Sequence, residues 1–442
     1  MLCKSSLRTL APTLAFFVSV TNALVAPRSP TFFPFSFPFF GGGGERGHHH
    51  HDGNPGFGAG NGGGNQGSSS VCSNGQSTQN QVCCVWYDVL QDVQANLFSG
   101  GQCDDFAHDS LRLTFHDGIG FSFALTAQGL WGGGGADGSI IEHSDVEMSW
   151  GVNEGLELIV EEQRKIADTW GVSYGDIIQF AGAVSVRNCA GGPKIQFLAG
   201  RSKDTQAAPP NLVPEAFDSV DTILARMADA GFSANDLVDL MASHSIGFQE
   251  HVDTTVPGTP FDTTPQELDS QFFLETMLRG TINIGGQNTL NPGEALSPIP
   301  GEFRLQSDFL LARDGRTSCR WQEWAAEEAN MQAAFATAMA KLAITGQDVS
   351  QLADCSEVIP NAQPYTPRLP HLPPQKSFFD IEFSCPATKK LGNGNNRGWQ
   401  TLPGPLQRIP TIYSQPGFLR TVVQATTKGS GGIWDWISSL FN

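Results

Sequence analysis

Basic residues are scarce in this chain of 442 residues. It has 26 lysines and arginines against 44 aspartates and glutamates, which gives a formal net charge of −18. Binding to nucleic acid or to an anionic membrane surface needs a basic face, so this balance disfavours both kinds of partner. The charge suits neutral or cationic partners instead.

Long apolar runs are also scarce. The run at residues 10–20 follows Lys4 and Arg8 and precedes small or polar residues, which is typical of a secretory signal peptide. This run is too short to cross a bilayer, and no later run is long enough to do so. We therefore expect residues 1–23 to be a signal peptide and the mature protein to be secreted and extracellular.

Paired CxxC motifs are absent, which argues against a structural zinc cage. Of the nine cysteines, Cys3 lies in the signal peptide. An even number then remains in an exported chain, which predicts four disulfides. About 105 pairings of eight cysteines are possible, and their spacing alone does not choose among them.

Alternating strand patterns and internal repeats are scarce too, so we expect a mainly α-helical fold. Helical spacing of apolar residues, with Ser or Asp before and Gly after, predicts helices over residues 81–98, 103–117, 172–188, 233–247 and 330–345. Residues 24–70 are dominated by Pro, Phe and Gly and predict a disordered arm. The histidines at 48–51 favour a solvated loop over a loose metal site. Residues 386–442 predict an extended tail.

The stretch "LRLTFHDG" ends a predicted helix on which four ionisable residues are spaced by four, three and four positions: Asp105, Asp109, Arg112 and His116. This spacing places all four on one stripe. A solvated helix face is the simpler interpretation, but the end of the stripe runs into apolar sequence. A histidine can take a proton from an incoming acid and return it, and an arginine can stabilise a departing oxygen anion. Heterolysis of a peroxide needs both.

A second histidine, His244 in "LMASHSIG", follows Leu237, Leu240 and Met241 on a predicted helix. A histidine on an apolar face is most often a packed core residue. It becomes a metal ligand when a second group orients its other nitrogen, and Asp308 in "RLQSDF" is a candidate for that role.

Two segments are rich in oxygen ligands of the kind that calcium prefers. Neither matches an EF-hand, and a loop rich in Asx turns explains each equally well. The first segment offers Asp137 and Ser139, which Asp117 would join if it lies nearby in the fold, and the second offers Asp262, Thr264 and Asp269.

Taken together, several motifs resemble the fungal secreted class II haem peroxidases, which include the manganese, lignin and versatile peroxidases. The resemblance runs from about residue 71 to residue 385. The motifs, in chain order, are "LRLTFHDGIGFS", "GGGGADGS", "QFAGAVSVRNCAGGPKIQFLAGR", "MASHSIG", "PFDTTPQELDSQFF" and "RLQSDF". The resemblance implies a mainly helical two-domain fold with haem b between a distal domain (residues 71–200) and a proximal domain (residues 201–385). It also implies an enzyme, a monomer by our expectation, that reacts with H2O2 and is restored by one-electron donors.

The resemblance assigns roles to individual residues. His244 would bind the iron with Asp308 hydrogen-bonded to it, and His116 would be the distal acid–base catalyst with Arg112 as its partner. Phe115 would pack over the haem, and Asn153 and Glu147 would continue a hydrogen-bond chain from His116. One calcium would take Asp117, Gly135 (carbonyl), Asp137 and Ser139, and the other Ser245, Asp262, Thr264, Glu267 (carbonyl) and Asp269. The disulfides would be Cys72–Cys84, Cys83–Cys355, Cys103–Cys189 and Cys319–Cys385.

The electron donor is less constrained. Manganese-oxidising members carry two glutamates and one aspartate where this chain has Asp105, Asp109 and Glu250. All three positions are therefore still acidic, but aspartate stands in place of each glutamate and glutamate in place of the aspartate. Three carboxylates suit Mn²⁺, and we expect a Mn²⁺ site; surface acids unrelated to a metal are the alternative. Lignin-oxidising members carry an exposed tryptophan where this chain has Asp239, so that route is not expected. Trp150 and Trp170 are more typical of packing.

Three other functions stay open. A generic peroxidase would oxidise small phenols at the haem edge only. A secreted, calcium-stabilised binding protein on the same scaffold would be catalytically inactive, which Arg112, His116, His244 and Asp308 argue against. A hydrolase with a Ser–His–Asp triad is the third alternative, but this sequence lacks the glycines of a nucleophile elbow.

Overall fold

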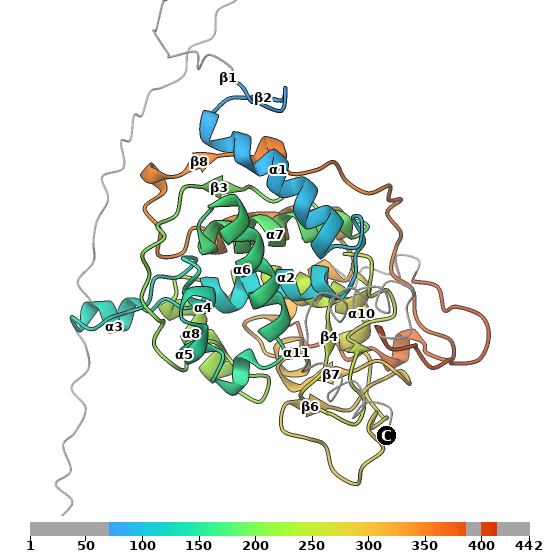
Figure 1. Ribbon diagram of the computed structural model, residues 1–442. Coiled ribbons are helices and arrows are strands. Elements are labelled where there is room, and N and C mark those ends of the chain that lie inside the picture. The colour runs from blue at the N-terminus through green and yellow to red at the C-terminus, as the bar shows by residue number, and fades with distance from the viewer. Residues whose placement is uncertain (1–69, 386–398, 413–442) are drawn as a thin grey trace, which may run out of the picture. The chain divides into compact units, whose positions relative to one another are not determined.

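The computed structural model describes residues 70–385 and 399–412. The predicted signal peptide, nearly all of the predicted arm and most of the predicted tail lie outside these residues. Within the described part, α-helices dominate and every strand is two residues long, paired antiparallel with one other strand. The expected mainly α-helical fold is confirmed (Figure 1). No described helix has the length and apolar character that a bilayer crossing requires.

The elements have the following bounds. The α-helices are α1 (Cys84–Asp92), α2 (Asp105–Gly118), α3 (Phe123–Ala127), α4 (Ser139–Glu142), α5 (Ser144–Glu147), α6 (Glu157–Trp170), α7 (Tyr174–Asn188), α8 (Val220–Asp229), α9 (Ala234–Leu240), α10 (Gln271–Met277), α11 (Gln306–Leu311), α12 (Ser318–Trp324) and α13 (Glu328–Leu342). The strand pairs are β1 (Ser70–Val71) with β2 (Ser77–Thr78), β3 (Leu198–Ala199) with β8 (Ala353–Asp354), β4 (Phe248–Gln249) with β5 (Thr259–Pro260), and β6 (Glu294–Ala295) with β7 (Arg304–Leu305).

Helices α2 and α7 form the centre of the first half of the fold. Asp104 begins α2 by accepting a hydrogen bond from the amide of Ala107, and Ser173 begins α7 in the same way through Asp176. The two helices pack closely because α7 has no side chain at Gly182, where a Cβ would lie 2.1 Å from Cγ2 of Thr114. This contact fixes the orientation of α2, and therefore of its ionisable stripe.

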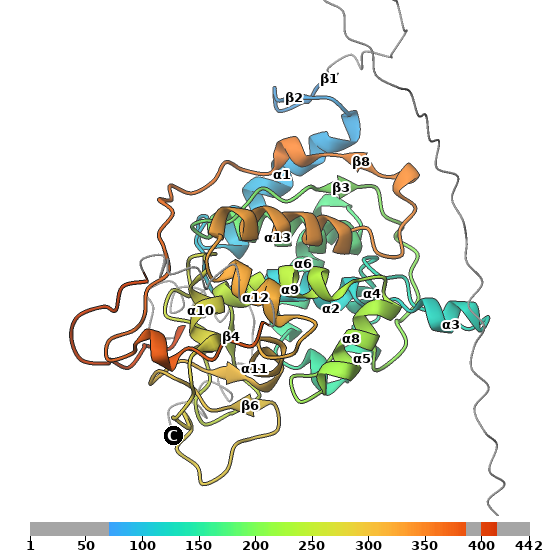
Figure 2. The ribbon, with the colours of Figure 1, turned by 180° about the vertical axis from the view of Figure 1, so that it is seen from behind.

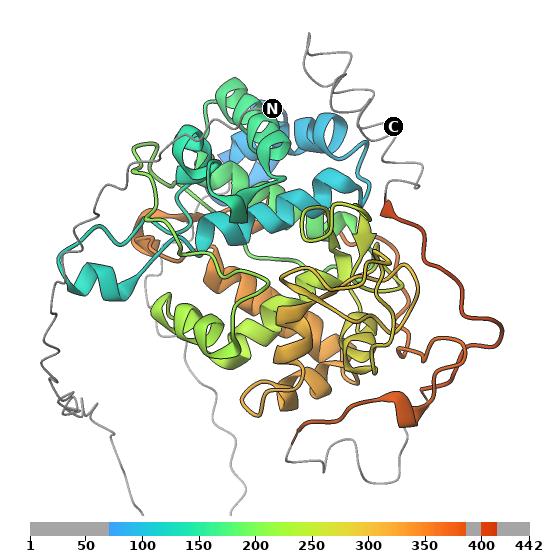
Figure 3. The same ribbon diagram turned by 90° about the horizontal axis from the view of Figure 1, so that it is seen from below.

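Helix α9 leads the second half of the fold toward the site. Ser233 and Asp236 form a capping box at its start. The prediction of a single helix over residues 233–247 is wrong, because α9 ends at Leu240 and a 3₁₀ helix, Met241–Ile246, follows it. Helix α13 packs along α9, as the reverse view shows (Figure 2). In Figure 3 the blue and teal helices of the first half lie above the yellow and orange helices of the second.

All four expected disulfides are confirmed: Cys72–Cys84, Cys83–Cys355, Cys103–Cys189 and Cys319–Cys385. The second of these joins residues 272 positions apart and ties the turn before α1 to the segment after β8. Cross-links that close long loops remove the most entropy from the unfolded chain. The disulfides therefore hold the chain closed around the helices that carry the candidate site.

Candidate active site

A cavity of about 560 Å³ lies between α2 and the 3₁₀ helix Met241–Ile246. Its volume is in the range of cofactor and ligand pockets. Much of its lining is apolar and comes from both halves of the fold, including Phe115, Val213, Leu240, Met241, Phe261 and Leu305. Both histidines singled out in the sequence line this one cavity, His116 from α2 and His244 from the 3₁₀ helix.

The distal histidine is held in one tautomer by a neighbouring amide. Asn153 donates from Nδ2 to the carbonyl oxygen of Glu147 at 2.9 Å, so its Oδ1 faces Nδ1 of His116 at 2.8 Å. An amide oxygen only accepts, so the Nδ1 of His116 carries the proton and Nε2 is left as an acceptor. The expected chain from His116 through Asn153 to Glu147 is present, but it ends on the backbone carbonyl of Glu147 rather than on its carboxylate.

Burial, and after it the positive charge of Arg112, lower the pKa of His116 to about 3. Arg112 donates from Nε to Nε2 of His116 at 3.3 Å. Its Nη2 donates to the carbonyl oxygens of Val152 and Glu154 at 3.1 and 3.0 Å. The guanidinium is therefore fixed beside a neutral imidazole that can accept a proton.

The second histidine is oriented by a buried carboxylate. Nδ1 of His244 lies 3.0 Å from Oδ2 of Asp308, whose residue is only 1% exposed. The rings of Phe261 and Phe272 pack beside the imidazole. Because Nδ1 faces Asp308, Nε2 is the nitrogen that remains for a ligand in the cavity, which is the arrangement of a metal-binding histidine.

An oxygen-rich cluster follows α2. Both carboxylate oxygens of Asp117 accept from the amide of Gly138, at 3.0 and 3.1 Å, and Asp137 accepts from the amide of Ser139 at 2.9 Å. Burial, and then the charges of Asp137 and Glu147, raise the pKa of Asp117 well above its ordinary value. Arg201, paired with Asp176 at 2.7 Å, donates to the carbonyl oxygen of Ala136 and holds this loop in place.

A second oxygen-rich cluster lies after the 3₁₀ helix. Ser245 donates to Oδ2 of Asp262 at 3.1 Å and to the carbonyl oxygen of Glu267 at 2.9 Å, and Thr264 donates to Asp269 at 3.2 Å. Burial raises the pKa of Asp269 to about 7 and, together with the charge of Asp269, raises that of Asp262. Both clusters gather buried oxygen donors whose charge a hard cation would neutralise.

The three acids predicted to bind manganese lie near one edge of the cavity. Asp109 and Glu250 line it, and Asp105 lies one turn before Asp109 on α2. Burial raises the pKa of Asp105, and the charges of Asp109 and Glu250 raise it further. These acids interact electrostatically, but among the described residues their oxygens do not form a group within 4.8 Å of one another.

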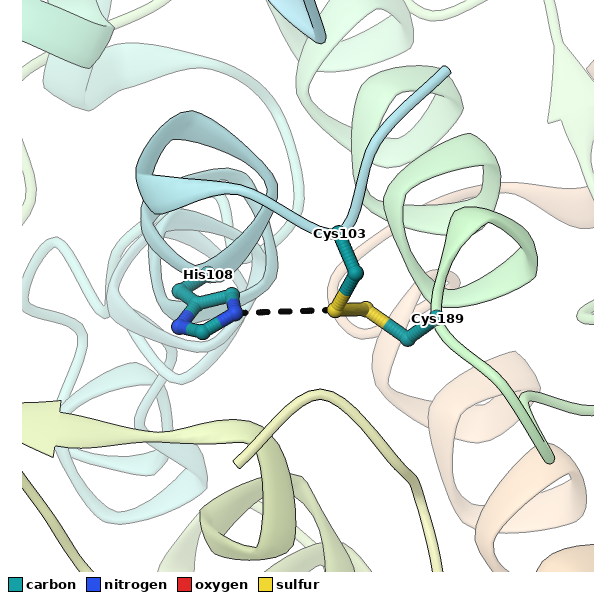
Figure 4. A group of neighbouring side chains, drawn as sticks. All are labelled: Cys103, His108 and Cys189. Carbon is teal, nitrogen blue, oxygen red and sulfur yellow. Dashed lines mark hydrogen bonds between the residues drawn. A yellow bond between two sulfur atoms is a disulfide. The ribbon is translucent and has the colours of Figure 1, made fainter. Parts of the chain in front are cut away.

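One such tight group does occur in the described chain, formed by Cys103, His108 and Cys189 (Figure 4). The two cysteines are bonded to each other, so neither offers the thiolate that a metal needs. Nε2 of His108 lies 3.5 Å from Sγ of Cys103, and burial lowers the pKa of this histidine to about 4. The group is therefore a packed histidine beside a disulfide, and His108 also belongs to the lining of the cavity.

Several residues at the cavity were not singled out in the sequence. Glu154, Glu215, Phe217 and His251 all line it, and all come from loops. Loops carry no periodic pattern, so no signal within the sequence itself distinguished these four residues.

Asp239 occupies a structural position rather than a surface one. It is 6% exposed and accepts from Arg320 at 2.8 and 3.0 Å and from Nε1 of Trp324 at 2.7 Å. These contacts join α9 to α12. Position 239 therefore holds a buried carboxylate and no exposed aromatic ring.

Comparison with known proteins agrees with this geometry. The peroxidase family matches residues 89–327, and the fungal peroxidase extension region matches residues 330–392. The chain belongs to the peroxidase family. It is 48% identical to a peroxidase of Arthromyces ramosus over 73% of this chain and 88% of that protein. It is 48% identical to versatile peroxidase VPS1 of Pleurotus eryngii (77% and 90% covered) and 45% identical to ligninase B of Phanerodontia chrysosporium (79% and 92% covered).

The chain is therefore a haem peroxidase of the fungal class II group, as its motifs indicated. The cavity also fits haem by its physical properties, independently of these comparisons. It is largely apolar, has the volume of a cofactor site, and presents a carboxylate-oriented imidazole on one wall and a neutral imidazole on the other.

Proposed function

We propose that this peroxidase is secreted and uses H2O2 to oxidise Mn²⁺ and small phenols in one-electron steps. The observation that carries the proposal is a single cavity with Arg112 and His116 on one wall, His244 on the other, and the acids Asp109 and Glu250 in its lining. The predicted signal peptide and the four disulfides support secretion.

The residues of the cavity divide the reaction between them. His244 would hold haem through Nε2, and Asp308 would strengthen its donor character. When bound, haem supplies an iron that takes up the two oxidising equivalents of peroxide and releases them one electron at a time. Nε2 of His116 accepts the proton of H2O2 and returns it to the departing oxygen, so that water leaves as the O–O bond breaks. The guanidinium of Arg112 stabilises negative charge on that oxygen.

The acids near the cavity edge support Mn²⁺ as a donor. Burial raises the pKa of Asp105 and of Asp109, and the negative charge of Glu250 raises both further, a repulsion that a divalent cation would relieve. Oxygen ligands suit Mn²⁺, which carboxylates bind well. Small phenols need no such site and can reach the cavity past its apolar lining.

The test is an Asp105→Ala, Asp109→Ala double variant. Turnover of Mn²⁺ should be abolished while oxidation of a small phenol such as 2,6-dimethoxyphenol stays within about twofold, because Asp109 acts on Arg112 through its charge only, and Arg112 keeps its hydrogen bonds to the carbonyl oxygens of Val152 and Glu154. Glu161→Ala, an exposed acid on α6, is a matched control and should leave both activities unchanged. Unchanged Mn²⁺ kinetics in the double variant would refute the manganese site and leave a phenol-oxidising peroxidase.

We also propose that the two oxygen-rich clusters bind calcium. Without a cation, Asp269 has a pKa of about 7, so between its ordinary value and pH 7 the folded protein binds more protons than the unfolded chain. Stability should then fall as pH rises through this window, and calcium should restore it. The measurement is Tm with EDTA or with calcium at pH 5 and pH 7. A calcium effect that did not grow with pH would contradict the assignment.

A further inference from the structure

His251 lies between two carboxylates at the edge of the cavity. Its Nδ1 is 3.4 Å from Oε1 of Glu154, and its Nε2 is 3.5 Å from Oε2 of Glu250. Glu154 follows the 3₁₀ turn Gly151–Asn153 of the first half of the fold, whereas Glu250 follows β4 in the second half. All three residues line the cavity. The imidazole therefore links the two halves of the fold. It does so in the part of the cavity lining that contains Glu250, a proposed manganese ligand.

The position of the imidazole is built into the backbone. Gly155 has φ +90°, and a Cβ there would lie 2.4 Å from Nε2 of His251 and 3.3 Å from Nη1 of Arg112. Any side chain at residue 155 would displace the ring, so glycine provides the space that His251 occupies. The ring is thus seated against the same loop whose carbonyl oxygens anchor Arg112.

This contact acts on Glu250, one of the three acids proposed to bind Mn²⁺. Asp105, Asp109 and Glu250 interact through their charges, yet their oxygens are not all within 4.8 Å of one another in the described chain. Glu250 has one carboxylate oxygen facing His251 instead. Oε2 of Glu250 can bind an ion held by Asp105 and Asp109 only when it leaves this contact.

We propose that His251 is a positioning residue that sets the affinity of the enzyme for Mn²⁺ by competing with the ion for the carboxylate of Glu250. Glu154 moderates the competition, because it holds the opposite nitrogen of the same ring. The inference rests on the proposed manganese site and assigns that site a residue that weakens it.

The test compares His251→Leu, which keeps the bulk of the ring without its nitrogens, with the wild-type holoenzyme. The dissociation constant for Mn²⁺ should fall about two- to fivefold, as expected for the loss of one partly exposed charge contact. Binding can be measured on the resting enzyme by the loss of the free Mn²⁺ EPR signal. In steady state, KM for Mn²⁺ should fall by the same factor while kcat for Mn²⁺ and the kinetics of a small phenol stay constant. His371→Leu, a partly buried histidine outside the cavity lining, is the matched control and should change none of these.

A second arm separates this role from bulk electrostatics. Glu154→Gln releases His251 toward Glu250 and should raise KM for Mn²⁺ more than Glu157→Gln does, although Glu157 acts directly on Asp109 through its charge. In the His251→Leu background Glu154→Gln should lose this extra effect, because the ring through which it acts is gone. An effect of Glu154→Gln that is the same in both backgrounds, or an unchanged Mn²⁺ affinity in His251→Leu, would overturn the inference. If Mn²⁺ binds neither wild type nor variant, the proposed manganese site itself fails, and Asp109→Asn identifies that case because it too then changes nothing.

Discussion

The two walls of the cavity carry the same side chain in different surroundings. His116 lies on a regular α-helix, and its Nδ1 faces the amide of Asn153. His244 lies on a 3₁₀ helix, and its Nδ1 faces the carboxylate of Asp308. A neutral amide oxygen accepts a hydrogen bond from Nδ1–H without adding charge, whereas a carboxylate adds a full negative charge behind the ring.

This difference separates a proton carrier from a ligand. An imidazole backed by an amide, beside the cation of Arg112, stays neutral, so it is free to accept a proton and then readily gives it up. An imidazole backed by a buried carboxylate donates electron density strongly to whatever it binds. Histidine thus serves two roles in this cavity, and the residue that faces its Nδ1 decides which role it takes.

Removing the proton carrier should have the largest effect. His116→Ala should lower the bimolecular rate constant for reaction with H2O2 by about 10²- to 10⁴-fold, because among the described residues His116 supplies the side-chain nitrogen that is hydrogen-bonded to Arg112. The measurement is stopped-flow absorbance of the Soret band. The variant should retain its haem, since His244 is untouched, and a rate within tenfold of wild type would contradict the assignment.

Removing the neighbouring charge should come next. Arg112→Gln should lower the same rate constant by about 10²- to 10³-fold, as for the loss of one preorganised group that stabilises an oxyanion. Because Arg112 also lowers the pKa of His116, the acid limb of the pH–rate profile should move to higher pH in this variant. A slower rate with an unmoved acid limb would mean that the guanidinium does not act on the imidazole.

Changing the carboxylate on the other wall should have a smaller effect. Asp308→Asn makes the backing of His244 resemble that of His116 and should cost about 10- to 100-fold in iron affinity or activity. Haem retention on dialysis and the reduction potential of the iron are the readouts, and the potential should rise as negative charge is removed. Asp314→Asn, a half-buried acid paired with Arg316 outside the cavity lining, serves as the control.

The sequence predicted the distal wall well because its signals are local. The helix expected over residues 103–117 is α2, Asp105–Gly118, and the Ser173 cap begins α7 where expected. The periodic stripe of Arg112 and His116 then follows from helix geometry alone. Motif resemblance supplied the pairing of His244 with Asp308, which lie 64 positions apart, and the structure brings them into contact.

The proximal wall was predicted less well because tertiary packing decides it. The apolar pattern of Leu237, Leu240 and Met241 continues past the end of α9, so it could not reveal the change to a 3₁₀ helix at Met241. Glu154 and His251 come from loops on opposite halves of the fold, and their contact exists only once those halves meet. Sequence periodicity contains no information about such contacts.

The smallest effect is expected from an exchange on the distal wall. Asn153→Asp gives His116 the kind of partner that His244 has, and a carboxylate favours the charged imidazolium. The pKa of His116 should rise from about 3, and the acid limb of the reaction with H2O2 should move up by roughly one to three pH units while the plateau rate at pH 7 changes little. Asn153→Ala is the control. The hydrogen bond to the side-chain amide of Asn153 raises the pKa of His116, so its loss should leave the acid limb in place or move it to lower pH. If both substitutions moved the limb in the same direction, the outer partner would not decide between proton carrier and ligand, and the contrast between the two walls would have to arise from the helices themselves.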